Sequence, residues 1–413
     1  MKFRLLLTIL FSCHLAFSQT TLISADHLFD GNEMHNNWGV VVEENRIVEV
    51  GPISKIKTKY DTTITYSGGT IIPGMIEGHS HVLLYPYDQA DWNDQVLKES
   101  RSLRAIRGSV MAKRNLMAGF TSIRDLGSEG AEYADVAVKQ SIEQGITIGP
   151  RMLVAGKAIV ATGSYGPKGF HPDFEVPLGA EPADGNDLIR VVRDQIGKGA
   201  DFIKVYADYR WGPNKEAMPT FSIEELKLIV ETAKSSGRDV VAHASTNEGM
   251  RRATLAGVVS IEHGTDATDE VLKLMKERNV ALCPTLAATY SITKYRGWDG
   301  SSPEPEEIKA KRASFDKALK SGVTIIAGGD VGVFPHGENA LELTMMSEYG
   351  MLNIDVLKSI TSVNARVFKL KELGELKTGY LADIVVVDGN PSEDINALKN
   401  VKFVMKDGDI YKK

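Results

Sequence analysis

Residues 70–82 read TIIPGMIEGHSHV, an apolar, β-branched run that ends in two histidines separated by one serine. On a β-strand, residues i and i+2 point to the same face. His79 and His81 are therefore predicted to project side by side from the end of a buried strand. Two neutral imidazoles held in this way can bind one metal ion. The simpler alternative is a pair of histidines on an exposed edge strand.

Seven more short β-branched runs follow, with helical periodicity between them. They lie at 121–127, 151–159, 201–207, 240–244, 260–264, 281–286 and 324–330. The segment 222–235 has apolar residues at helical spacing, and Ser222 and Glu225 at its start predict a capping box. Eight strands, each followed by enough chain for a crossover helix, predict an α/β fold, a TIM-like (β/α)8 barrel over residues 74–373.

The flanks of this region have a different pattern. Residues 19–73 and 374–413 contain strands and tight turns without room for helices. We expect the two ends to pair into one small composite β-sandwich beside the barrel. The chain would then be a barrel with a split appendage, and not two independent enzymes.

Composition and charge exclude some classes of protein. The 413 residues are 43% hydrophobic and 25% charged, which is typical of a globular protein with a large core. The formal net charge is −6, and no block rich in lysine and arginine is present. Nucleic acid is therefore not an expected partner.

The first 18 residues have the pattern of a secretory signal. Lys2 and Arg4 precede a short apolar run, and small residues occupy the −3 and −1 positions of a cleavage site after Ser18. The run is too short to span a bilayer, so we predict no membrane span and a periplasmic or secreted protein. Lipidation at Cys13 is the alternative, although Phe11 fits a lipobox poorly. Cleavage would leave only Cys283, and hence no intramolecular disulfide.

Several metal-competent groups lie in or at the ends of the predicted strands. The C-terminal strand ends of such a barrel converge on one mouth, where active sites are built. Each group alone has a simpler explanation, such as a core histidine or a capping aspartate. Lys204 is unusual because burying an unpaired ammonium is costly. Six such groups together predict a metal site, and they are His79, His81, Lys204, His243, His263 and Asp330.

This ordered set resembles the amidohydrolase superfamily, and within it the imidazolonepropionase-like and Xaa-Pro dipeptidase-like hydrolases. The resemblance covers almost all of the mature chain. It implies a binuclear site, usually with two zinc ions. One ion would be bound by His79, His81 and Asp330, and the other by His243 and His263. Lys204, carboxylated by carbon dioxide, would bridge the two.

The site predicts a mechanism. Two zinc ions lower the pKa of a bridging water enough to supply hydroxide near neutral pH. Asp330 would take the proton and deliver it to the leaving nitrogen. Tyr206 lies two residues beyond Lys204, hence on the same strand face, and is a candidate to hydrogen-bond the oxyanion or a substrate carboxylate. Its alternative role is packing in the barrel wall.

The substrate is less well indicated. Long loops at the mouth carry Tyr165, Lys168, Arg210 and His336, which we take as candidate substrate-binding residues. The last three could bind a terminal carboxylate, or could be solvated surface charges. Some relatives carry TGGHG where this chain has TGSYG, so their substrate preference is not transferred.

The prediction is therefore an exported, metal-dependent amidohydrolase that cleaves the amide C–N bond of a small peptide-like substrate. A Xaa-Pro dipeptide or an N-acyl amino acid is the preferred substrate. A cyclic amide of the imidazolone type, a lactone or an ester is the alternative. A non-catalytic periplasmic solute-binding protein is the alternative from another class. Family members often form homo-oligomers, so self-association is also expected.

Overall fold

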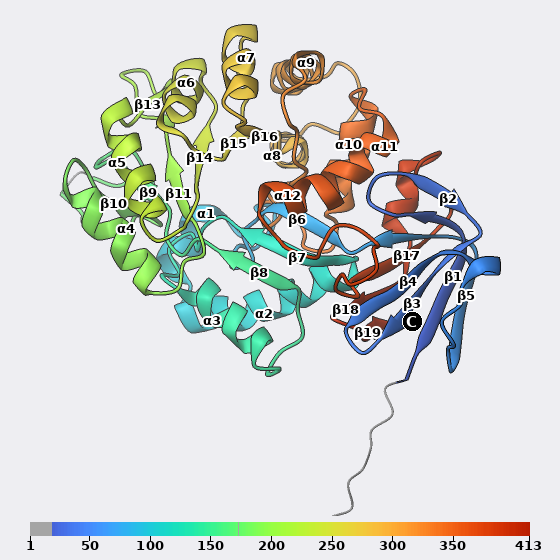
Figure 1. Cartoon of the computed structure of the whole chain (residues 1–413). Helices are drawn as coiled ribbons and strands as arrows, with labels where there is room; N and C mark the ends of the chain where they lie inside the picture. Colours follow the sequence, from blue (N-terminus) through green and yellow to red (C-terminus); the bar gives the residue numbers. More distant parts are fainter. Residues whose placement is uncertain (1–18, 172) are drawn as a thin grey trace, which may run out of the picture.

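Strands from both ends of the chain form one mixed sheet of eight strands (Figure 1). The computed structural model describes residues 19–171 and 173–413. The order is β19-β18-β17-β5-β1-β3-β4, with β2 paired to β1, and only β1 and β5 pair in parallel. The strands are β1 (Thr21–Phe29), β2 (Met34–Asn36), β3 (Trp38–Glu43), β4 (Arg46–Pro52), β5 (Thr62–Pro73), β17 (Ile384–Asp388), β18 (Val401–Lys406) and β19 (Asp409–Lys412).

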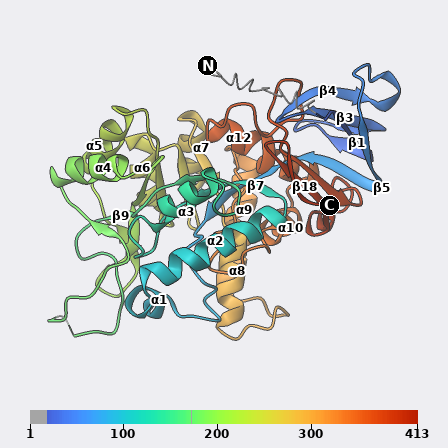
Figure 2. The same cartoon turned by 90° about the horizontal axis from the view of Figure 1, so that it is seen from below.

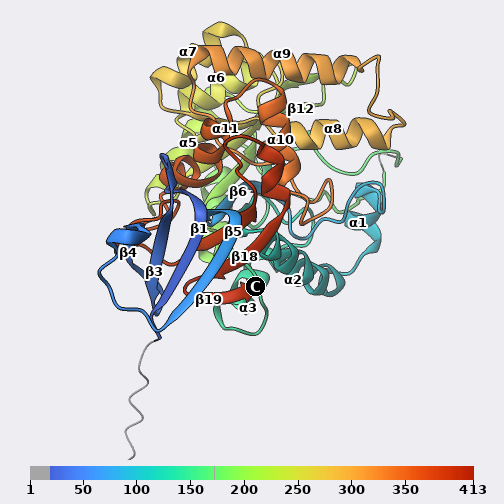
Figure 3. The ribbon, with the colours of Figure 1, turned by 90° about the vertical axis from the view of Figure 1, so that its right-hand side faces the viewer.

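This sheet replaces the β-sandwich that the sequence predicted. Strand β5 has 12 residues and pairs with β1 on one side and β17 on the other, so it joins both chain ends into a single sheet. Along β17, Val386 belongs to an apolar cluster within this sheet, whereas Val385 belongs to the main core. Both faces are therefore buried, as alternation along a strand requires. Figure 3 shows the sheet face-on, in front of the helices.

The remaining strands are mostly parallel. One group is β6 (Met75–Ser80), β7 (Phe120–Asp125) and β8 (Arg151–Val154). The second is β10 (Glu181–Pro182), β9 (Ile159–Val160), β11 (Ile203–Tyr206), β14 (Val240–Ala244), β15 (Ser260–His263) and β16 (Ala281–Cys283). A short antiparallel pair, β12 (Asp208–Arg210) and β13 (Ala217–Pro219), lies outside them.

Backbone hydrogen bonds link the two parallel groups at both edges. On one side, Asp201 N donates to Val154 O at 2.8 Å. On the other, the segment 324–331 runs between β16 and β6, where Ile326 N donates to Leu282 O at 2.9 Å and Gly78 N donates to Ala327 O at 3.0 Å. With the helices that cover it, this arrangement is a mixed α/β fold of the TIM-barrel type.

Two of the predicted strands are interrupted. The segment 324–330 pairs only through isolated bridges near its ends, because two glycines are followed by Asp330 with a φ of +64°. The run 151–159 divides into β8 and the start of β9, with Gly156 at a φ of +70° between them. Residues in the left-handed region cannot continue a strand. The first interruption places Asp330 at the cavity described below.

Twelve α-helices surround the parallel strands in the described part of the chain (Figure 2). The helix predicted over 222–235 is α5, and its capping box has both bonds, which confirms that prediction. No described helix is long and apolar enough to cross a membrane. The predicted signal, with Ser18 and Cys13, lies outside the described residues. The helices are α1 (Trp92–Lys98), α2 (Arg101–Met117), α3 (Ala134–Glu143), α4 (Asp187–Gly197), α5 (Ile223–Lys234), α6 (Asn247–Ala256), α7 (Asp269–Glu277), α8 (Leu286–Tyr295), α9 (Glu306–Ser321), α10 (Ala340–Glu348), α11 (Asn353–Lys358) and α12 (Asn364–Val367).

The close approach of segment 324–331 to β6 predicts the effect of one substitution. A Cβ at Gly328 would lie 2.5 Å from His79 N and 2.8 Å from the Cys283 Sγ. Gly328→Ala is expected to destabilise the fold by about 1–3 kcal/mol, measured as a lower thermal midpoint. Gly197→Ala is the control, because a Cβ there has no atom within 4 Å, and its midpoint should be unchanged or slightly raised. Equal midpoints for the two variants would contradict the expected clash.

Candidate metal centre

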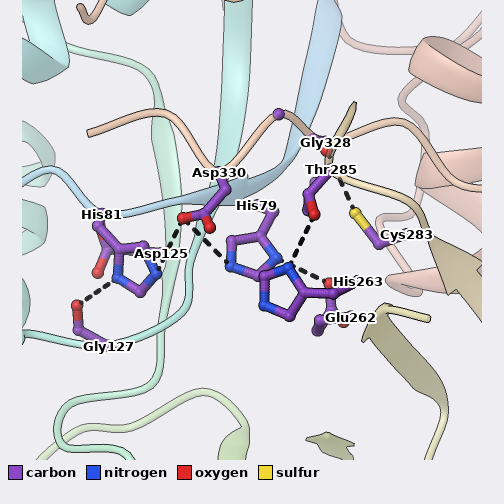
Figure 4. A network of polar contacts seen from close by, with 12 residues as sticks. His79, His81, Asp125, Gly127, Glu262, His263, Cys283, Thr285, Gly328 and Asp330 are labelled. Atoms are coloured by element: carbon purple, nitrogen blue, oxygen red, sulfur yellow. Dashed lines mark hydrogen bonds and ion pairs between the residues drawn. The ribbon is translucent and has the colours of Figure 1, made fainter. Parts of the chain in front are cut away.

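Three of the predicted ligands converge at the end of β6 (Figure 4). The Nε2 atoms of His79 and His81 lie 3.6 Å and 3.4 Å from Asp330 Oδ1. The three ligand atoms lie within 4.8 Å of one another. Among the described residues, the buried Asp330 Oδ1 has no hydrogen-bond donor. Two nitrogen lone pairs and an unsatisfied carboxylate oxygen facing one another fit a divalent metal ion.

The other predicted ligands continue this cluster. The His263 ring lies 5.2 Å from that of His79 and 4.5 Å from that of His243, between centroids. Tyr206 stacks on His243 with its ring centroid 4.5 Å away, and the buried Lys204 Nζ lies 5.5 Å from the Tyr206 ring centroid. The four histidines, Asp330 and Tyr206 line one cavity of about 280 Å³. The remaining predicted ligands therefore lie in or beside the same cavity as His79, His81 and Asp330.

Burial sets the protonation of these groups. It lowers the pKa of His79, His243 and His263 well below the usual value for histidine, and the neighbouring cationic groups add to this effect. The three imidazoles are therefore neutral near pH 7 and have a lone pair to donate. Burial also lowers the pKa of Lys204, against the attraction of Glu262 and Asp330. Lowering this pKa increases the share of neutral amine.

Hydrogen bonds to the Nδ1 atoms orient the ligand histidines. His81 Nδ1 donates to Gly127 O at 2.9 Å, which leaves its Nε2 lone pair free. His79 Nδ1 lies 3.0 Å from the Glu262 carboxylate, and His263 Nδ1 lies 2.8 Å from Thr285 Oγ1. Partners of this kind fix the tautomer and the ring orientation of metal-binding histidines.

Glu262 is central to this support. It is fully buried and also accepts hydrogen bonds from Arg124 Nη2 at 2.8 Å and from Ser260 Oγ at 2.5 Å. Arg124 in turn donates to Gly78 O at 2.7 Å, beside His79 in the chain. The ion pair between Arg124 and Glu262 therefore fixes the first ligand histidine through both its ring and its backbone.

Glu262→Gln tests this support. An amide can still accept one bond, but it loses the charge that holds both His79 and Arg124, so metal affinity is expected to fall about 10–100-fold. Competition with a chelator measures that affinity. Glu248→Gln on α6 is the matched control, because Glu248 pairs with exposed Arg251 and Arg252 away from the cavity. A Glu262→Gln protein with unchanged metal affinity would show that the carboxylate has no such role.

Four non-glycine residues at this site have left-handed backbone conformations. They are Glu129, His263, Thr285 and Asp330, with φ between +46° and +79°. Such conformations cost about 1–3 kcal/mol each and persist where surrounding structure enforces them, often at functional sites. Their concentration around one cavity agrees with a functional site there.

The predicted substrate-binding residues separate into two groups. Tyr165 and Arg210 line the same cavity as the histidines. Lys168 does not line it, and its backbone oxygen accepts a bond from Asn93 Nδ2 at 3.2 Å. His336 is buried elsewhere, with Nδ1 3.2 Å from Asn115 Nδ2, and lines a separate cavity beside α2. A turn follows Asp330, where Val333 N donates to Asp330 O at 3.3 Å, and His336 beyond it lines the cavity beside α2 and not the cavity of the metal cluster.

Sequence reasoning missed other residues of the cavity, notably Glu129, Lys311 and Tyr87. Glu129 follows β7 within the sequence DLGSEG, so the strand-end rule that found the histidines could have found it. Lys311 lies on α9, where its Nζ donates to His263 O at 2.7 Å. No local pattern marks that lysine, because its position depends on how α9 packs.

A parallel-strand fold of the TIM-barrel type with histidines and an aspartate at its strand ends defines a class of metal-dependent hydrolases. The amidohydrolase family model matches residues 70–411, and the chain belongs to that family. It is therefore a hydrolase that acts on C–N amide bonds, as its relatives below also indicate.

Known relatives agree with this assignment. Ochratoxinase from Aspergillus niger is 32% identical over 435 residues, covering 96% of this chain and 87% of the relative. A crystal structure of a Xaa-Pro dipeptidase with bound methionine has a TM-score of 0.84 and 31% identity, covering 96% of this chain and 100% of the other. Imidazolonepropionase from Clostridium tetani is 24% identical, covering 93% and 94% of the two chains. The resemblance found in the sequence is confirmed.

Proposed function

We propose that this protein is an exported, metal-dependent amidohydrolase that cleaves the amide bond of a small peptide-like substrate, with Xaa-Pro dipeptides preferred. The observation that carries the proposal is the unsatisfied Asp330 Oδ1 facing two histidine nitrogens, in a cavity that also holds His243 and His263. The similarity to a Xaa-Pro dipeptidase and to ochratoxinase supports this choice of substrate class.

The size and charge of the cavity also support a small substrate with a carboxylate. A volume of about 280 Å³ is near the lower end for small-molecule sites. Arg210 and Lys311 line it and could each pair with a terminal carboxylate. Dipeptides and N-acyl amino acids both carry that group.

Two divalent ions, most commonly zinc in such sites, would supply the activated water and polarise the scissile carbonyl. His79, His81 and Asp330 would hold one ion, and His243 and His263 the other. We propose that Lys204 reacts with carbon dioxide to form a carbamate, whose two oxygens suit a pair of cations. The lowered pKa of Lys204, caused by its burial, favours the neutral amine that this reaction needs.

The chain's own groups handle the proton and the oxyanion. Asp330 would take the proton of the attacking water and deliver it to the leaving nitrogen, so that the amine leaves neutral. Burial and the nearby Glu129 raise the pKa of Tyr206 well above its usual value, which keeps the phenol protonated. Tyr206 can therefore donate a hydrogen bond to the carbonyl oxygen as charge develops there.

Export is part of the proposal and rests on the sequence of residues 1–18. Its basic start, short apolar run and small residues before position 19 support a cleaved signal. The mass of the mature protein distinguishes cleavage after Ser18 from lipidation at Cys13.

The experiment that tests the function is an assay of the mature, zinc-loaded protein, prepared in bicarbonate, against a library of dipeptides and N-acyl amino acids. Hydrolysis of a Xaa-Pro subset is the expected result. No hydrolysis with two metals bound would overturn the peptide proposal in favour of lactams, lactones or esters.

A further inference from the structure

Glu129 is a buried carboxylate that lines the cavity without an ionic partner. The residue is 4% exposed and lies on the loop that follows β7. Oε2 accepts hydrogen bonds from Trp92 Nε1 and Tyr165 OH, both at 2.8 Å, whereas Oε1 has only the Tyr206 hydroxyl at 3.5 Å. Within residues 19–171 and 173–413, no lysine, arginine or histidine forms an ion pair with this carboxylate. A buried charge paired only with neutral donors is costly.

One nearby cationic group, the guanidinium of Arg104, binds the backbone of this loop and not the carboxylate. The buried guanidinium of Arg104 donates to the backbone oxygens of Glu129, Ser128 and Leu83, at 2.6 to 3.1 Å, and so fixes the loop and not the carboxylate. This loop holds Glu129 at a φ of +46°, in the left-handed region that is unfavourable for glutamate. Glu129 is therefore held here in a strained backbone conformation, and the hydrogen bonds from Arg104 stabilise that conformation.

Tyrosine rings surround the same carboxylate. The Tyr165 ring lies 4.8 Å from the rings of Tyr206 and Tyr209, between centroids, and Tyr87 also lines the cavity. Burial and the charge of Glu129 raise the pKa of Tyr87, Tyr165 and Tyr206 well above the usual value, so these phenols stay neutral. Tyr165 and Tyr206 direct their hydroxyls at the carboxylate, and neutral aromatic rings beside a carboxylate form a favourable environment for an organic ammonium group.

The opposite charge lies at another part of the cavity. Glu129 Oε1 is near His81, because a Cβ built at Gly127 would lie 3.5 Å from that oxygen and 3.7 Å from the His81 ring. Lys311, in contrast, contacts the backbone of His263. A substrate centred on the histidines would therefore find an anionic group beside one end of the cluster and a cationic group beside the other.

We propose that Glu129 and the surrounding tyrosines bind the free α-ammonium group of the substrate, and so select dipeptides over N-acyl amino acids. This inference rests on the proposed function and narrows its substrate class. A zwitterionic dipeptide places its ammonium on the acyl side of the scissile bond and its carboxylate on the leaving side. The separated charges of Glu129 and Lys311 match that pattern, and an N-acyl amino acid would leave Glu129 without a cation.

The test compares alanyl-proline with lactyl-proline, in which a hydroxyl replaces the ammonium at nearly constant shape. At about pH 6.5 the α-amino group is protonated. Wild-type enzyme is expected to prefer alanyl-proline about 10–100-fold in kcat/KM, the size expected for a hydrogen-bonded charge pair. Glu129→Gln keeps an acceptor for Trp92 and Tyr165 and is expected to lose most of this preference, with little change for lactyl-proline.

Glu132→Gln is the matched control, since Glu132 lies on the same loop but pairs with Arg101 and Lys157 outside the cavity. Its preference should equal that of wild type. A Glu129→Gln protein that slows both substrates equally, or that loses metal, would overturn the proposal, because Glu129 would then act on the tyrosines or the metal centre. A wild-type enzyme with equal kcat/KM for alanyl-proline and lactyl-proline would also overturn the proposal.

A binding measurement separates this proposal from the proposed function. Calorimetry compares alaninamide and lactamide, which differ only in ammonium and hydroxyl, on metal-loaded wild type and Glu129→Gln. Preferential binding of alaninamide that the substitution removes would support the cation site even if no dipeptide were hydrolysed. Equal binding of the two amides to wild type would overturn it, whatever the enzyme hydrolyses.

Discussion

Lys204→Ala is expected to lower kcat/KM by at least about 10³-fold, or about 4 kcal/mol of transition-state stabilisation. Lys204 is buried in β11, and its proposed carbamate would supply an anionic ligand to the metal site. Alanine leaves a space and removes that anion, so the metal content should fall along with the rate. Metal per chain and kcat/KM are measured on the same preparation.

Rescue of the Lys204→Ala activity by an added carboxylate distinguishes a bridging carbamate from a structural lysine. Acetate or propionate, added to Lys204→Ala with excess zinc, should restore part of the activity, because a short carboxylate fits the space and supplies two oxygens. Lys406→Met is the control, since Lys406 is a buried lysine that donates to Gly149 O at 3.0 Å, away from the cavity. Its activity should remain near wild type and be insensitive to acetate. Full activity and unchanged metal content in Lys204→Ala would contradict the carbamate.

The candidate metal ligands could be placed from the sequence because their positions follow from local rules. The spacing of His79 and His81 places both on one strand face, and the ends of parallel strands meet at one edge. The same rules placed Tyr165, which follows β9, and Arg210, although the predicted loop at Arg210 is the short strand β12 that follows β11. Apart from Lys204, which is buried beside the cavity wall, these residues line one cavity.

Other features depend on contacts between distant residues. Glu262 and His79 are 183 residues apart in sequence, and nothing local indicates that their side chains meet. His336 was misplaced for a different reason: it lies six residues beyond Asp330, and no local pattern shows into which cavity its side chain turns. The eight-stranded sheet likewise depends on the length of β5, whereas the sequence showed only that both chain ends contain strands.

Asp330→Asn is expected to lower kcat by about 10³–10⁴-fold. This is the upper end of what a general acid–base group contributes, because the variant also loses the negative charge of a metal ligand. Asparagine is also the residue best suited to preserve the backbone conformation. Asp330 has a φ of +64°, and aspartate and asparagine both tolerate this left-handed region. The variant should therefore fold. The rate of single turnover and the metal content are measured together.

The two measurements separate the roles of the carboxylate. His79 and His81 remain, oriented by Glu262 and Gly127 O, so at least part of the metal should stay bound in Asp330→Asn. A rate that falls much further than the metal content shows that the carboxylate also moves the proton. A rate that falls only in proportion to lost metal would reduce Asp330 to a ligand. Asp316→Asn, which removes an exposed pair with Lys320, should alter neither quantity.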